Sequence, residues 1–332
     1  LNFQKDYHGV KLYRLEQNYR STKNIVNAAN SIISQNKNKI EKVVWTSNME
    51  GSKIKLQRCI TDADEGREVA SQIFELKMQE QRQNKEFAIL YRTNAQSRSI
   101  EDALRKRDIP YRIYGGLSFY QRKEIKDLLA YMRLIVNPKD EESLKRVINF
   151  PSRGIGQATL DKLIIGAKNH GISLFETVQN APKLNLSLNA GTLKKLESFA
   201  NLILSLQIEN QNSNAFEISD KVTKKSGLVL ELKKDGTPEG VSKIENIEEL
   251  LNGIRDFVEG QKELAGAKGS LSEFLEDVAL ATDFDNEKES DSDSVYLMTI
   301  HLSKGLEFPV VFIVGLEEDL FPSALSLNTR SE

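Results

Sequence analysis

Two short apolar runs near the end of the chain, residues 295–300 and 309–314, constrain its fold more than any other feature. Each is continuous and contains several β-branched residues, which predicts buried strands of a parallel sheet. A purely structural connection between two core strands needs few functional side chains, yet this one is crowded with them. They are Thr299, His301, Ser303, Lys304 and Glu307, with Gly305 among them. The loop therefore predicts a ligand site at one edge of a sheet.

A second polar segment, residues 15–22, lies near the start of the chain and reads Leu-Glu-Gln-Asn-Tyr-Arg-Ser-Thr. It follows a predicted strand and precedes a predicted helix. Ser21 or Thr22 suits the N-cap, because a short side-chain oxygen accepts hydrogen bonds from the free amides of a first helical turn. Capping does not account for Tyr19 and Arg20 directly before it, so both are candidate ligand contacts.

The order of periodicities predicts an α/β parallel-sheet domain interrupted by a large all-α insertion. Residues 1–113 alternate strands with helices, residues 114–291 show only helical apolar stripes, and strands return within 292–332. We therefore predict one discontinuous sheet domain, 1–113 with 292–332, and a helical domain, 114–291. The acidic run 283–293 is predicted to be a solvated linker at their boundary. The predicted strands of the first segment are 11–15, 53–60 and 86–91, and its predicted helices are 22–36, 62–81 and 95–107.

Composition agrees with a globular protein of about two domains, since the chain has 332 residues, 39% of them hydrophobic and 28% charged. No apolar run approaches the ~20 residues of a membrane span, and nothing resembles a signal peptide. The single Cys59, in a predicted strand, is expected to be a small core residue. One cysteine allows neither a disulfide nor a zinc framework, which suits a cytoplasmic protein.

Two features of a complete nucleotide hydrolase do not occur in this sequence. It contains no G-x-x-x-x-G-K-[ST] phosphate loop. Its two Asp-Glu pairs, at 64–65 and 140–141, do not follow an apolar strand, so neither is expected to hold Mg²⁺, and no metal site is predicted.

The polar segments 15–22 and 299–323 resemble motifs IV and V of the superfamily I DNA helicases of the UvrD/PcrA/Rep type. Residues 89–98, 110–116 and 152–156 also match, in family order, so the resemblance covers essentially the whole chain. It implies a RecA-like domain, similar to the P-loop NTPases but without the P-loop, called 2A, and a helical insertion called 2B. The family's last motif is expected soon after Ser323 and is absent. We therefore expect a C-terminal half cut from a larger helicase.

The resemblance assigns a nucleotide site to both polar segments. Arg20 is similar to the catalytic arginine finger that reaches the γ-phosphate of ATP, and Tyr19 is similar to the residue that stacks on adenine. Gly305 and Glu307 match the ribose contact. ATP with Mg²⁺ is therefore expected in the full-length protein, and none is expected to stay tightly bound to this portion alone. The alternative surface pairings are Arg20 with Glu16 and Glu307 with Lys304.

The resemblance also implies contacts with single-stranded DNA at two strand ends. Leu302 and Ser303 depart from the family's usual Ser-Ala, which leaves the local hydrogen bonds open. A structural N-cap is the alternative role for Asn94. The expected contacts are Arg92, Thr93 and Asn94 from one segment and Thr299 and His301 from the other.

Residues 152–156, Ser-Arg-Gly-Ile-Gly, resemble the hairpin of a helix-hairpin-helix module. Glycines let main-chain amides approach a phosphate at a helix N-terminus, where the helix dipole also favours an anion. Arg153, Gly154 and Gly156 are therefore candidate contacts to duplex or junction DNA, without sequence specificity. A tight turn between helices is the structural alternative.

Together these features predict part of an ATP-dependent 3′–5′ DNA helicase, an ATP hydrolase whose isolated portion is inactive. The expected partners are single-stranded and duplex DNA, the N-terminal RecA-like domain of the same protein, and repair or replication proteins. One alternative is a non-enzymatic module that binds DNA junctions or partner proteins. Another is the helicase part of a recombination helicase-nuclease.

Overall fold

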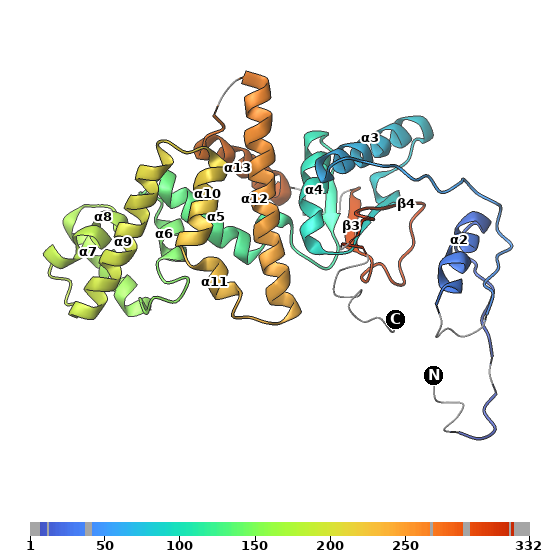
Figure 1. Ribbon diagram of the computed structural model, residues 1–332, viewed down its shortest axis with the longest axis horizontal. Helices are drawn as coiled ribbons and strands as arrows, with labels where there is room; N and C mark the ends of the chain where they lie inside the picture. Colours follow the sequence, from blue (N-terminus) through green and yellow to red (C-terminus); the bar gives the residue numbers. More distant parts are fainter. Residues whose placement is uncertain are drawn as a thin grey trace. The chain divides into compact units, whose positions relative to one another are not determined.

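The computed structural model describes residues 7–11, 13–36, 42–265, 268–287, 293–318 and 320–321, in two compact units (Figure 1). The first comprises the described residues of 1–60, 305–307 and 316–332. The second comprises those of 61–304 and 308–315. None of the described helices is both long and apolar enough to cross a membrane.

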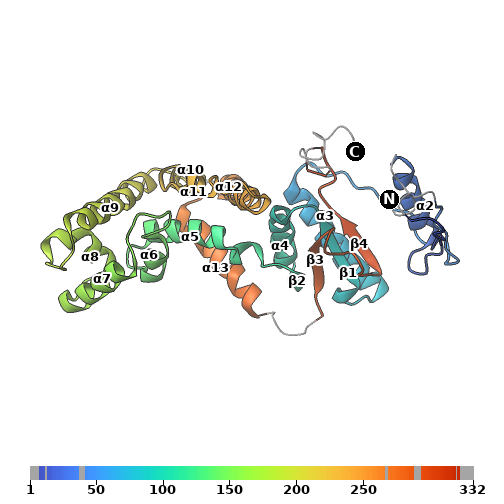
Figure 2. The same cartoon turned by 90° about the horizontal axis from the view of Figure 1, so that it is seen from below.

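A four-stranded, entirely parallel sheet with the order β2-β3-β1-β4 lies in the second unit (Figure 2). The predicted parallel α/β architecture is therefore confirmed. Sequence periodicity missed only β2, which has three residues between a proline and a two-glycine turn. The strands are β1 (Phe87–Tyr91), β2 (Tyr111–Ile113), β3 (Val295–Thr299) and β4 (Val310–Ile313).

Helices α3 (Asp62–Glu80) and α4 (Ser97–Lys106) share one hydrophobic core with the sheet. Ile73 and Leu104, one from each helix, are fully buried in it. Thr61 caps α3, because its Oγ1 accepts a hydrogen bond from the N–H of Asp64 at 3.1 Å. Glu65 in the first turn accepts from the N–H of Gly315 at 3.0 Å, so α3 begins beside the carboxyl end of β4.

The helical part of this unit, whose helices are drawn in Figures 1 and 2, has its own, larger hydrophobic core. The predicted apolar stripes lie on α5, α9 and α12, and their central residues are buried. Helix α5 contacts α9, α10 and α12 and is buried along most of its length, which places it in the middle of the core. The helices are α5 (Lys123–Val136), α6 (Glu141–Val147), α7 (Gln157–His170), α8 (Leu174–Asn180), α9 (Ala190–Asn210), α10 (Ala215–Lys225), α11 (Leu228–Leu232), α12 (Pro238–Ala265) and α13 (Leu271–Glu287).

Helix α12 is joined to α4 through a buried arginine. Arg98 of α4 is only 5% exposed and donates hydrogen bonds to Glu249 at 2.7 Å and Asp256 at 3.5 Å, both on α12. Gly253 lies between these carboxylates, where an added Cβ would be 2.6 Å from Nη1 of Arg98, so the glycine leaves room for the guanidinium. Two further carboxylates bind Arg98, those of Asp62 at 3.2 Å and Asp102 at 3.3 Å.

The first unit contains α2 (Lys23–Ser34), close to the predicted helix, but the predicted strand 53–60 is wrong. Residues 11 and 13–15, the described part of the predicted strand 11–15, form no strand either, and a β-bridge nearby joins Gln17 to Trp45. Apolar alternation indicates a strand only where a partner strand and a buried face exist. Neither exists for residues 53–60, where Leu56 is 87% exposed. Cys59 is accordingly half-buried in irregular structure rather than in a core strand.

The acidic run 283–293, predicted as a solvated linker, has regular structure or hydrogen bonds at both of its ends. Residues 283–287 are the last turn and a half of α13, and residues 288–292 lie outside the described parts of the chain. The carboxylate of Asp293 accepts hydrogen bonds from the N–H groups of Asn84 at 2.9 Å and Lys85 at 2.7 Å. This residue therefore anchors the entry to β3 against the turn before β1.

Candidate nucleotide and nucleic-acid sites

Arg20 and Glu307, 287 positions apart in the sequence, form an ion pair within the first unit. Nε of Arg20 donates to Oε2 of Glu307 at 2.5 Å, and its Nη1 donates to the carbonyl oxygen of Leu306 at 3.2 Å. The two side chains are 50% and 67% exposed. Among the described ion pairs, Arg20 does not pair with Glu16, nor Glu307 with Lys304. The fold thus brings two predicted nucleotide contacts together.

The segment around Arg20 is shaped by two asparagines. Oδ1 of Asn18 accepts from the N–H groups of Arg20 at 2.9 Å and Ser21 at 2.8 Å, which forms the turn before α2. Nδ2 of Asn48 donates to the carbonyl oxygens of Tyr19 and Ser21. Thr22 occupies the predicted N-cap position, but its side chain makes no capping hydrogen bond, so that expected role is wrong.

The Tyr19 ring is 77% exposed, and its hydroxyl donates to Oε1 of Gln17 at 2.8 Å. Gly305 adopts a left-handed φ of +94°, which a residue with a Cβ rarely adopts. An exposed aromatic face, a half-exposed guanidinium and a carboxylate suit the base, the phosphates and the ribose hydroxyls of a nucleotide.

A second set of predicted residues meets at the carboxyl ends of β1 and β3, which are adjacent in the sheet. Tyr91 pairs with Thr299 in the register, so the residues after each strand emerge side by side. Nη1 of Arg92 lies 3.4 Å from Nδ1 of His301. The carboxyl edge of a parallel sheet is where α/β proteins bind ligands. The fold therefore brings the two predicted single-strand contacts together.

Gln96, which sequence reasoning did not single out, fixes the Arg92 loop. Its Oε1 accepts from the N–H groups of Arg92 and Thr93, both at 2.9 Å. The expected structural role of Asn94 as the N-cap is corrected, because the cap of the short 3₁₀ helix Asn94–Gln96 is Thr93. Asn94 itself is exposed. The signal for this arrangement is the Thr-x-x-Gln spacing of a capping box.

The departure from the family pattern at residues 302–303 also has a structural account. The N–H groups of Leu302 and Ser303 donate to the carbonyl oxygen of Thr299, at 3.0 and 3.2 Å, so the chain turns tightly after β3. Oγ of Ser303 donates to the carbonyl oxygen of Ile300 at 2.8 Å. The Leu302 side chain lies over Gly115, where an added Cβ would be 2.9 Å from its Cδ1.

Arg153 is part of the internal support of its hairpin. Its Nη1 donates to the carbonyl oxygens of Val147 at 3.0 Å and Pro151 at 3.2 Å. Its Nη2 donates to the Tyr131 hydroxyl at 2.7 Å and to the carbonyl oxygen of Ser226 at 3.1 Å. With four intramolecular acceptors, this guanidinium is not presented to solvent as a free phosphate ligand. These bonds show that Arg153 supports the turn, and its expected contact with duplex DNA stays a prediction.

The two glycines of the hairpin are exposed and differ in conformation. Gly154 has a left-handed φ of +68°, and its carbonyl oxygen accepts from Nζ of Lys195 at 3.4 Å. Gly156 is the N-cap of α7, with φ −80° and open space around its missing Cβ. Oδ1 of Asn149 accepts from the N–H groups of Arg153 and Ile155 and so closes the turn.

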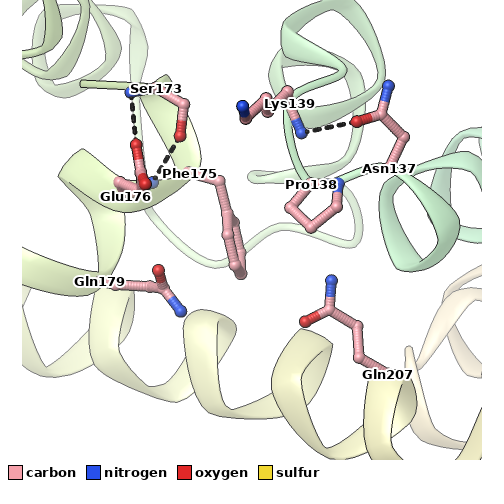
Figure 3. A pocket seen from close by; sticks show the side chains of 8 residues that line it. All are labelled: Asn137, Pro138, Lys139, Ser173, Phe175, Glu176, Gln179 and Gln207. Atoms are coloured by element: carbon pink, nitrogen blue, oxygen red, sulfur yellow. Dashed lines mark hydrogen bonds between the residues drawn. The ribbon is translucent and has the colours of Figure 1, made fainter. Parts of the chain in front are cut away.

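A surface recess of about 290 Å³ lies elsewhere, in the helical part. It is formed between α5, α8 and α9, with Phe175 projecting between Pro138, Gln179 and Gln207 (Figure 3). Ser173 and Glu176, at its rim, bind each other through main-chain N–H groups. None of the predicted site residues lines it. Among the described residues, no cluster of acidic, histidine or cysteine side chains is placed to hold a metal ion.

The structure thus combines a parallel α/β sheet, polar loops at its carboxyl edge, where such sheets bind ligands, and a helical part between two of its strands. A sequence profile of the UvrD-like helicase C-terminal domain matches residues 13–332. This chain therefore belongs to the UvrD-like helicase C-terminal domain family, as the motif resemblance indicated.

Two relatives show the extent of the likeness. The chain is 41% identical over 337 residues to the ATP-dependent DNA helicase PcrA of Bacillus subtilis strain 168, an alignment covering 100% of this chain and 45% of that protein. It is also 41% identical over 336 residues to PcrA of Staphylococcus aureus strain Mu50, covering 100% and 44%. The chain thus spans less than half the length of these relatives.

Proposed function

We propose that this chain is the part of an ATP-dependent 3′–5′ DNA helicase that supplies the arginine finger, the adenine and ribose contacts and two DNA-binding surfaces. The meeting of Arg20 with Glu307 is the observation that carries this proposal. We propose residues 1–113 with 292–332 as the RecA-like domain and 114–291 as its helical insertion. The names of the relatives, ATP-dependent DNA helicases that match this chain along its full length, support the assignment.

In this proposal Arg20 is the catalytic residue. A guanidinium keeps its charge at all physiological pH values, and its forked N–H groups match phosphate oxygens as negative charge accumulates there. Tyr19 and Glu307, with Gly305 in the turn, hold the adenine and ribose. ATP supplies the phosphoryl group whose hydrolysis drives the motor. The phosphate loop and the Mg²⁺ ligands of the full-length protein are expected on its N-terminal RecA-like domain, since this sequence contains no phosphate loop.

Single-stranded DNA is proposed to cross the carboxyl ends of β1 and β3. Arg92 and His301 there donate to phosphate oxygens, with Thr93, Asn94 and Thr299 as neighbouring polar contacts. Such contacts position a strand without reading its sequence.

Duplex DNA is proposed to contact the turn at Gly154 and Gly156 through main-chain amides at the N-terminus of α7. Arg153 contributes by holding this turn from inside the helical core. The contact therefore depends on backbone shape and is not expected to discriminate between sequences.

The decisive experiment replaces Arg20 with Ala in the full-length protein that contains this chain. We expect kcat for DNA-stimulated ATP hydrolysis to fall by about two decades or more, because arginine fingers contribute roughly 10³–10⁵ in related enzymes. ATP and DNA affinities should change little, since the arginine acts mainly on the transition state. Steady-state kinetics and equilibrium binding measure the two effects separately.

Arg67→Ala is the matched control, because Arg67 is an exposed arginine on α3 whose ion pair, among the described residues, is with Asp64 of the same helix. It should leave kcat unchanged. An unchanged kcat in Arg20→Ala would show that Arg20 is structural and would refute the proposed catalytic role.

A further inference from the structure

Tyr114 is an exposed aromatic residue at the same sheet edge as the proposed single-strand contacts. It directly follows β2, and its N–H donates to the carbonyl oxygen of Leu297 on β3 at 2.9 Å. Its side chain is 43% exposed. Because β2, β3 and β1 are consecutive in the sheet and neighbouring strands lie about 4.8 Å apart, β2 lies roughly 10 Å across the sheet from β1. Its last residue is level with Ile89, two residues before β1 ends.

The turn that presents Tyr114 is fixed by the loop after β3. Gly115 has a left-handed φ of +72°, and Leu302 lies over it. Leu302 is itself exposed. Tyr114, next to Gly115 in the chain, and Leu302 therefore form an apolar surface beside His301, which in turn lies 3.4 Å from Arg92.

Tyr111, the first residue of β2, is a tyrosine with a structural role and serves as a comparison for the burial and hydrogen bonding of Tyr114. It is buried in the core, and its hydroxyl accepts a hydrogen bond from Arg105 at 3.1 Å. Tyr114 has neither burial nor, among the described contacts, a hydrogen bond or ring partner for its side chain. Its aromatic face is therefore available to a ligand.

We propose that Tyr114 stacks on a base of single-stranded DNA whose backbone is held by Arg92 and His301. The inference rests on the proposed single-strand path and adds a base contact to it. Proteins that bind single strands without sequence preference combine cationic contacts along the backbone with aromatic faces for the bases. The apolar surface at Tyr114 and the polar pair Arg92–His301 provide these two elements side by side.

The test measures binding of the 332-residue chain to an oligothymidylate and to an abasic strand of the same length at fixed salt. Tyr114→Ala should weaken oligothymidylate binding roughly five- to a hundredfold, as expected for the loss of one stacked base. It should leave binding of the abasic strand unchanged. Tyr114→Phe should retain the affinity, because it keeps the aromatic face and removes only the hydroxyl.

Phe74→Ala is the matched control. Phe74 is 41% exposed, but it lies nine residues after Glu65 on α3, which places it about 13 Å away from the carboxyl edge where that helix begins. This variant should bind both strands like the wild type.

Two outcomes separate this inference from the function on which it rests. An equal loss on both strands, or no loss on either, in a folded Tyr114→Ala chain overturns the stacking role. Arg92→Ala should weaken binding to both strands and flatten the log–log salt dependence by about 0.7, the value for one phosphate of a single strand. A salt dependence unaffected by Arg92→Ala overturns the proposed path itself.

Discussion

Two glycines separated by one residue, Gly154 and Gly156, have different conformational requirements. Gly154 adopts the left-handed region, whereas Gly156 has a backbone that any residue adopts and no neighbour near its missing Cβ. Gly154→Ala should lower the free energy of unfolding by about 1–2 kcal/mol. For Gly156→Ala, reduced freedom of the unfolded chain offsets a poorer N-cap, so the change should stay within about 1 kcal/mol.

Urea unfolding of the two variants at one pH measures this difference. Equal destabilisation would contradict the backbone argument. A Gly156→Ala chain that is stable but binds duplex DNA more weakly would indicate that its Cβ blocks the approach of a phosphate, because strain in the turn would then be excluded.

At the same scale, Arg153 shows where sequence reasoning stops. The resemblance of residues 152–156 to a helix-hairpin-helix predicted glycines in a turn before a helix, and Gly156 is the N-cap of α7. The side chain of Arg153 is held by carbonyl groups from Val147, Pro151 and Ser226, the last of which is 73 positions away. No local pattern indicates a partner so distant in sequence. From sequence alone, a charged residue beside a glycine turn can equally bind a phosphate of a ligand or main-chain carbonyl groups of the protein itself.

At the scale of elements, the joint between α4 and α12 should make stability depend on pH. Burial raises the pKa of Glu249, and the attraction of Arg98 offsets only part of this, since several carboxylates share that arginine. A carboxyl group with a higher pKa in the folded state binds its proton more tightly there. Its contribution to stability is therefore complete below the unfolded pKa of about 4.3 and is lost as the pH rises through the folded pKa.

Glu249→Gln keeps an acceptor for Arg98 and removes this titration. The free energy of unfolding of the wild type, minus that of the variant, should therefore decrease as the pH rises from about 4 towards 7. Urea unfolding across this range measures it. A Glu249→Gln difference that rises with pH would contradict the raised pKa.

The elements that the sequence predicted best are those with a buried face. Helices α3, α4 and α5 and strands β1, β3 and β4 were anticipated because each presents its apolar residues to one core. The predicted strand 53–60 failed, because alternation does not reveal whether a partner strand is present. At the sites, residue types and neighbourhoods were predictable from motifs. The pairing of Arg20 with Glu307, the cap at Thr93 and the anchor at Asp293 depend on contacts between segments far apart or on local register.

At the scale of the whole molecule, the chain by itself should not hydrolyse ATP. In the proposed motor it supplies Arg20, Tyr19 and Glu307, but its sequence contains no phosphate loop. We expect the purified 332-residue chain to show no ATP hydrolysis above background, with or without single-stranded DNA, in a phosphate-release assay. The full-length protein provides the positive control. DNA-stimulated hydrolysis by the chain alone would contradict its role as one part of a motor.

In the absence of nucleotide, the positive charge of Arg20 and the negative charge of Glu307 neutralise each other within the proposed nucleotide site. Inorganic phosphate can replace Glu307 as the partner of Arg20, but it leaves the Glu307 carboxylate without a partner. A nucleoside without phosphates can bind Glu307 through its ribose hydroxyls, but it leaves Arg20 without a partner. An intact nucleotide relieves both groups at once, with phosphates for Arg20 and hydroxyls for Glu307. Because the pair is half-exposed, it contributes about 0–1 kcal/mol, so this filter discriminates by a few-fold at most. Inorganic phosphate or a nucleoside alone should therefore bind a few-fold more weakly than an intact nucleotide, and the freed inorganic phosphate should be the product held least tightly.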